Sequence, residues 1–220
     1  MELHQLKWFG GRLLFMADPI QAVPFRRGAG RLCLDFLRTL RYRGTAEATE
    51  ELAGPAALDS WIRQFGPPLA GGRRLPTAAE VSEARRLREA IYELIVAGLG
   101  GGACRAAARN LVNRHAACPV PAPRLGSAGQ MTWHADAPVP AILALVSRDA
   151  LDLVASPAIL RVRRCANQAC RVMFFDGSRP GTRRWCSMET CGDQAKKAAL
   201  RTRAGAVGRG GPGERKILTA

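Results

Sequence analysis

Hydrophobic residues recur every three or four positions through the middle of this chain, which is the spacing of amphipathic helices. The clearest run follows Thr77 and Glu80, which form a capping box, and it ends at Gly98 and the glycines 100–102. Its apolar positions are Val81, Ala84, Leu87, Ile91, Leu94 and Ile95. The same spacing predicts further helices over residues 31–44, 55–66, 105–116 and 140–155. The first two thirds of the chain are therefore expected to be mainly helical.

Shorter extended segments interrupt this pattern. Residues 125–134, around GQMTW, predict a strand or hairpin, and the first residues of the segment 31–44 suit a strand as well as a helix. Ser156 and Pro157 mark a boundary, after which LRVRRC reads as an alternating basic strand. The predicted fold class is α+β: a mainly α N-terminal domain with a small β element, followed by a compact C-terminal module.

These changes of pattern divide the chain of 220 residues into four segments. Residues 1–24 are predicted to be an extension, for which a short strand and turn or a loose attachment fit equally. Residues 25–157 are predicted to be a helical domain, and residues 158–203 a separate module. Residues 204–220 are rich in glycine and basic residues, which predicts a disordered tail.

Four cysteines dominate the C-terminal module. Their arrangement is C-x4-C-x15-C-x4-C, formed by Cys165, Cys170, Cys186 and Cys191. Two close cysteine pairs joined by a short insert are typical of a tetrahedral zinc site, whereas disulfides or coincidence are the alternatives. Because four cysteines leave no open position for substrate, we expect one structural zinc ion rather than a catalytic one. No catalytic residues are predicted, and the chain is not expected to be an enzyme.

The sequence around the cysteines predicts a treble-clef-like finger, that is, a β-hairpin followed by a helix. Residues 172–175 suit one strand, residues 176–181 a turn, and residues 183–185 the return strand. Thr190 and Asp193 fit an N-cap pattern, so a helix carrying Cys191 in its first turn is expected to run to about Arg203.

Positive charge is concentrated in the same part of the chain. The formal net charge is +15, and residues 160–220 hold 14 Lys/Arg against 4 Asp/Glu, a net of +10. This distribution favours an anionic partner, although an arginine-rich composition also suits a merely solvated face. The candidate phosphate contacts are Arg163, Arg164, Arg183, Arg184, Lys196, Lys197, Arg201 and Arg203.

Other residues offer weaker signals. Cys33 lies in an apolar run and is predicted to be a buried core thiol, and the histidines are scattered. The apolar run at residues 12–17 is too short for a signal peptide, and no run approaches the length of a membrane span. A reducing cytoplasm, with no membrane partner, is the expected location.

Residues 183–203, RRWCSMETCGDQAKKAALRTR, together with FFDGS at 174–178, resemble the CGNR-type zinc finger. Asp193 and Gln194 stand where that family has Asn-Arg. RLCLDFLRTL at residues 31–40 resembles the opening LCLDFVNT of the ABATE-type domain, with Arg38 in place of its asparagine. The resemblance implies a stress-induced transcription regulator whose helical domain senses a small-molecule or protein signal and whose finger binds DNA.

Three functions therefore compete on the sequence alone. The first is a zinc-dependent, DNA-binding transcription regulator. The second is a zinc-stabilised protein that binds RNA or the ribosome, and the third is an adaptor whose basic surface binds an acidic protein. Readout of base edges, dependence on the 2′-hydroxyl, and salt-sensitive binding to protein alone would separate them.

Overall fold

The computed structural model describes residues 25–70, 74–100 and 102–207, with side chains as far as Thr202. The expected extension at residues 1–24 lies outside this range, as do residues 208–220 of the tail expected over residues 204–220. The first four residues of that tail, 204–207, are helical. The helices described are α1 (Leu32–Leu37), α2 (Pro55–Phe65), α3 (Ala78–Gly98), α4 (Ala106–Ala117), α5 (Pro138–Ala155) and α6 (Asp193–Val207). A 3-10 turn, η1 (Pro157–Arg161), follows α5, and a π-helical turn, η2 (Met188–Gly192), precedes α6.

The strands form three antiparallel pairs in the described part of the chain. They are β1 (Leu40–Arg41) with β2 (Thr49–Glu50), β3 (Ala122–Leu125) with β4 (Met131–His134), and β5 (Val162–Arg164) with β6 (Met173–Phe175). Short strand pairs attached to a mainly helical body confirm the α+β class. None of the described helices is both long and apolar enough to cross a membrane.

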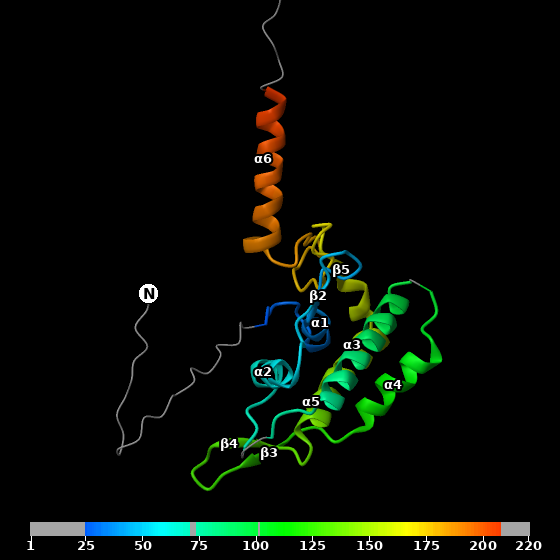
Figure 1. The fold of residues 1–220 in the computed structure, drawn as a ribbon, viewed down its shortest axis with the longest axis vertical. Coiled ribbons are helices and arrows are strands. Elements are labelled where there is room, and N and C mark those ends of the chain that lie inside the picture. Colours follow the sequence, from blue (N-terminus) through cyan, green and yellow to red (C-terminus); the bar gives the residue numbers. More distant parts are fainter. Residues whose placement is uncertain (1–24, 71–73, 101, 208–220) are drawn as a thin grey trace, which may run out of the picture.

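The helical body is built by α3, α4 and α5, which pack side by side, with α1 and α2 against α3 (Figure 1). Local sequence explains the ends of these helices. Thr77 accepts a hydrogen bond from the Glu80 amide at 3.2 Å, and the Glu80 carboxylate accepts one from the Thr77 amide at 2.7 Å, which confirms the capping box. Pro55 stands at the first turn of α2, where its missing amide proton costs nothing.

The helix expected over residues 31–44 is much shorter than the apolar spacing indicated. α1 ends at Leu37, and the chain continues into β1. The hydroxyl of Thr39 donates to the Phe36 carbonyl at 2.8 Å, and the Thr39 amide donates to the same oxygen at 3.2 Å. These bonds close a tight turn instead of another α-helical turn, because they take up the carbonyl that a continuing helix would use.

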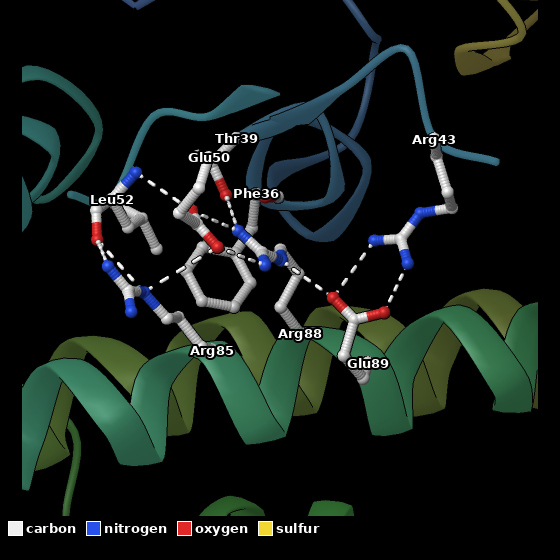
Figure 2. Close-up of polar contacts among 8 residues, drawn as sticks. All are labelled: Phe36, Thr39, Arg43, Glu50, Leu52, Arg85, Arg88 and Glu89. Atoms are coloured by element: carbon white, nitrogen blue, oxygen red, sulfur yellow. Dashed lines mark hydrogen bonds and ion pairs between the residues drawn. The ribbon is translucent and has the colours of Figure 1, made fainter. Parts of the chain in front are cut away.

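A buried ion-pair network fixes the segment after α1 onto α3 (Figure 2). The side chain of Arg88 is 3% exposed and donates two hydrogen bonds to Glu50, at 2.7 and 2.6 Å. It also donates to Glu89 at 2.9 Å and to the Thr39 hydroxyl at 3.1 Å. Burial disfavours the carboxylate of Glu50, yet the Arg88 hydrogen bonds lower its pKa below the ordinary value.

The C-terminal module packs directly on α1. The Phe175 amide donates to the Ala29 carbonyl at 2.7 Å, and Gly30 has a φ of +85°. A Cβ at Gly30 would lie 3.1 Å from Cβ and 3.2 Å from the carbonyl oxygen of Phe175, so glycine permits both the backbone turn and the close approach. Buried side chains of the module, including Phe174, belong to the same continuous core as α1 and α3.

Candidate metal centre and nucleic-acid interface

The four predicted cysteine ligands lie together. One ligand atom from each of Cys165, Cys170, Cys186 and Cys191 falls within 4.8 Å of all the others. The sulfur of Cys186 is 3.6 Å from that of Cys170 and 3.7 Å from that of Cys191. A tetrahedral ion with Zn–S distances of about 2.3 Å separates its sulfurs by about 3.8 Å. The donor set therefore fits zinc in both chemistry and spacing.

The first cysteine pair lies in the turn of the β5–β6 hairpin. The Cys165 amide donates to the Val172 carbonyl at 2.8 Å, and the Cys170 amide donates to the Asn167 carbonyl at 3.0 Å. These bonds close a tight turn that directs both sulfurs to one side. The sequence predicted the wrong partner for this hairpin: β6 pairs with β5, and residues 183–185 form no strand.

A buried carboxylate organises the loop that leads to the second pair. Asp176 is fully buried and accepts hydrogen bonds from the Ser178 hydroxyl at 2.6 Å, the Ser178 amide at 3.0 Å and the Arg183 amide at 2.9 Å. These hydrogen bonds, with the Arg161 cation, lower the pKa of Asp176 to about 2. This loop replaces the expected return strand, because Asp176 binds the Arg183 amide that a strand pair would use. Sequence reasoning noted FFDGS only as part of a motif and missed this role.

The second cysteine pair lies at the start of the C-terminal helix. The sequence predicted Thr190 as the N-cap of this helix, and that prediction is wrong. Ser187 takes that role, and its hydroxyl accepts from the Thr190 amide at 3.4 Å. The Gly192 amide donates to the Ser187 carbonyl at 3.0 Å, a bond that spans five residues and widens the turn. Cys191 lies inside this widened turn, where its thiolate is close to the positive end of the helix.

The sulfurs influence one another strongly. The hydrogen bond from Cys186 lowers the pKa of Cys170 to about 5 and raises that of Cys186, while burial raises the pKa of Cys191. Four thiolates at these distances repel one another, so the fully deprotonated set requires a cation beside it. A zinc ion supplies that charge, so zinc uptake releases protons and stabilises the module.

The basic residues of α6 are exposed. Lys196, Lys197 and Arg201 all face solvent, and their one ion pair with another described residue joins Lys196 to Asp193 at 3.8 Å. Figure 1 shows α6 projecting from one end of the molecule. Its main contact is with η2, and the Asn167 side chain donates to Gln194 at 2.9 Å. Arg203 lies on α6, beyond the described side chains.

The other four candidate phosphate contacts are spread over the module. Arg184 is exposed beside the Trp185 ring. Arg183 is half-buried, donates to the carbonyls of Trp185 and Cys186, and covers the Phe174 ring, so its guanidinium braces the metal-binding loop. Arg163 donates to the Leu160 carbonyl at 3.0 Å. Arg164 lines a groove beside α3 residues such as Tyr92. Their contact with nucleic acid stays a prediction.

Comparison with known proteins gives two family matches. Residues 30–157 match the model named ABATE, described as "Putative stress-induced transcription regulator". Residues 161–204 match the model of the CGNR zinc finger. No curated protein matches. With the sulfur geometry, the second match identifies the four cysteines as the site of one structural zinc ion.

Proposed function

Because the chain belongs to the ABATE family and carries a CGNR zinc finger, we propose that it is a transcription regulator that binds duplex DNA through α6. The zinc ion, held by the four cysteines, supplies folding free energy to the finger rather than reactivity. The helical body would then carry the regulatory signal to the finger that is packed on α1.

The exposure of α6 is the observation that carries this proposal. From Lys196 to Thr202, every described residue of the helix is exposed. Helices of this length are marginal in water when they stand alone, and most gain stability from packing an apolar face. α6 packs little within the chain beyond its first turn, so an external partner is the natural source of further contacts.

The charge of α6 defines that partner as anionic. Among the described residues, Lys197 and Arg201 have no ion pair, and the contact between Lys196 and Asp193 is long. Free cations on a projecting helix can replace the counterions of a phosphate backbone. The major groove of B-form DNA is about 12 Å wide and admits a helix, whereas that of A-form RNA is too narrow. Duplex DNA is therefore favoured over duplex RNA.

The test neutralises the three described basic residues of α6 together, as Lys196→Gln, Lys197→Gln and Arg201→Gln. Fluorescence anisotropy with a duplex of mixed sequence, over a series of salt concentrations, measures binding. We expect weaker binding to every sequence, and a log K versus log salt slope reduced by roughly one unit per lost phosphate contact.

A matched control removes the same charge elsewhere. Arg109 and Arg114 on α4 and Arg124 on β3 are exposed, and these elements lie away from α6 (Figure 1). Changing these three to glutamine lowers the net charge equally and should leave the salt slope near that of the parent. If both triple variants weaken binding alike, the attraction comes from overall charge and not from α6. If neither does, the proposal fails, and binding to an acidic protein becomes the better hypothesis.

A further inference from the structure

A cleft of about 430 Å³ lies between the helical body and the finger. The body contributes three arginines to its lining, Arg26, Arg38 and Arg41, and the Tyr42 side chain. The finger contributes Asn167 of the first metal-binding turn and the start of the C-terminal helix, including Thr190, Gln194 and Lys197. Whatever binds in this cleft touches both parts of the protein.

Arg38 is the most informative residue of the cleft because its guanidinium is nearly buried yet weakly paired. Its side chain is 8% exposed, and the nearest carboxylate, Asp35, lies 3.7 Å away. Its one hydrogen bond within the described chain goes to the Arg27 carbonyl at 2.9 Å. Arg88, whose side chain is 3% exposed, donates two hydrogen bonds to Glu50, at 2.7 and 2.6 Å. Arg38 thus retains donors that no close carboxylate satisfies.

The neighbouring arginines share this property. Arg41 is 3.4 Å from Glu51 and donates to the Tyr42 hydroxyl at 2.7 Å, while Arg26 is exposed and has no ion pair among the described residues. Asp35 and Glu51 therefore lie near the arginines, but neither carboxylate forms two parallel hydrogen bonds with a guanidinium. The lining holds four cationic side chains against two carboxylates, Glu189 and Asp193, and it also includes the zinc ligands Cys170 and Cys191. Asp193 lies 3.8 Å from Lys196 of α6.

Two of the positions at which the chain departs from the motifs it resembles, Arg38 and Gln194, line this cleft. In the resemblance described above, Arg38 takes the place of an asparagine and Gln194 that of an arginine. Both residues line the same cavity, Arg38 from the body and Gln194 from the finger. The finger has no arginine at position 194, whereas the body has one at position 38. The cleft therefore contains an arginine that the body contributes instead of the finger.

We propose that this cleft binds a phosphate group, with Arg38 as its buried anchor and Arg26, Arg41 and Lys197 around it. Its volume suits a small phosphate ester, and arginine forks match the oxygens of phosphate. A ligand held there would bridge the body and the base of α6. The site goes beyond the proposed function, since it stands whether or not α6 binds DNA. A phosphate of bound DNA could enter the same cleft, and the experiment separates the two sources.

The test measures binding of inorganic phosphate to the zinc-loaded full chain by isothermal titration in phosphate-free buffer. Arg38→Asn and Arg41→Gln should each weaken binding by about tenfold or more, because each removes a charge-assisted hydrogen bond. Arg114→Asn, an exposed change on α4, is the matched control and should bind as the parent does. Gln194→Arg added to Arg38→Asn should recover much of the loss, since it returns an arginine to the cleft from the finger.

Zinc content and duplex binding, measured on the same variants, complete the test. Loss of phosphate binding with unchanged duplex binding identifies a free phosphate ligand. Loss of duplex binding by Arg38→Asn and Arg41→Gln, without measurable binding of free phosphate, identifies a DNA phosphate in the same site. The proposal is overturned if both variants bind phosphate and duplex like the parent. It is also overturned if they lose zinc, because the arginines would then serve only to offset the charge of the thiolates.

Discussion

The helical body and the C-terminal helix both carry many basic residues, but they use them in opposite ways. On the body, outside the cleft, several arginines form close ion pairs with carboxylates, as in the pairs Arg88–Glu50, Arg31–Asp149 and Arg105–Glu93, all closer than 2.9 Å. On α6, the corresponding charges are exposed, with one contact at 3.8 Å. Figure 2 shows the paired arrangement, in which every drawn guanidinium meets an oxygen.

This difference separates charge that holds the fold from charge that is available to a partner. A buried pair contributes to stability only while both members remain, because removing one leaves an uncompensated charge. An exposed, unpaired cation contributes almost nothing to folding and is free to bind. Composition cannot make this distinction, since the arginines of both regions look alike in the sequence.

The largest effect is expected at the metal centre, because we expect the finger to need zinc for folding and the body to fold without it. Cys186→Ser should release the ion and unfold residues 160–203, because structural zinc supplies on the order of 10 kcal/mol to so small a module. Helices α3 to α5 should persist, since they bury their own apolar faces. Metal analysis and far-UV circular dichroism check both parts, and a variant that retains one zinc per chain would contradict the assignment.

A smaller effect is expected from the buried ion pair of the body. Arg88→Met keeps most of the apolar stem but removes both guanidinium hydrogen bonds to Glu50 and the one to the Thr39 hydroxyl. Among the described residues, this leaves Glu50 only the Leu52 amide at 2.9 Å and Arg85 at 3.5 Å. We expect a loss on the order of 3 kcal/mol in the free energy of unfolding, because one partner of a buried pair is removed. Denaturant unfolding measures it.

The double variant Arg88→Met with Glu50→Gln is the control for that result. It removes the stranded charge and should recover part of the loss. If Arg88→Met alone lowers the free energy of unfolding by less than about 0.5 kcal/mol, the ion-pair network does not stabilise the fold. The body and α6 would then not differ in how they use their charges.

The sequence predicted those features that depend on neighbouring residues. The capping box at Thr77, the proline start of α2 and the spacing of the four cysteines are local signals, and each is present in the structure. Cys33 is buried, as its apolar surroundings indicated. These elements could be predicted because the residues that determine them lie within a turn or two of one another.

The features that the sequence missed depend on distant contacts. β6 can pair with either neighbouring segment, and the choice was decided by the closed turn at Cys165 and by Asp176, which holds the Arg183 amide. The cleft could not be predicted either, because Arg38 and Gln194 line one cavity only when the finger packs on α1. The division between residues 25–157 and 158–203 stays a prediction, although both parts contribute to one core.

We expect the smallest effect on stability from neutralising the basic residues of α6. This result would distinguish most clearly between the charges of the body and those of α6. The variant carrying Lys196→Gln, Lys197→Gln and Arg201→Gln should unfold within about 0.5 kcal/mol of the parent, because exposed charges contribute little. Lys196 and Asp193 are 68% and 52% exposed, so their contact is well screened. Lysines near the start of a helix also oppose its dipole, so their removal can even stabilise α6 slightly.

Denaturant unfolding at saturating zinc checks this expectation on the same preparation that is used for DNA binding. Unchanged unfolding together with weakened, less salt-dependent binding would assign the α6 charges to a partner and not to the fold. A loss of more than about 1 kcal/mol would instead mean that these side chains hold the finger together. The charges of the body and of α6 would then serve the same purpose, and the case for α6 as a binding helix would rest on its exposure alone.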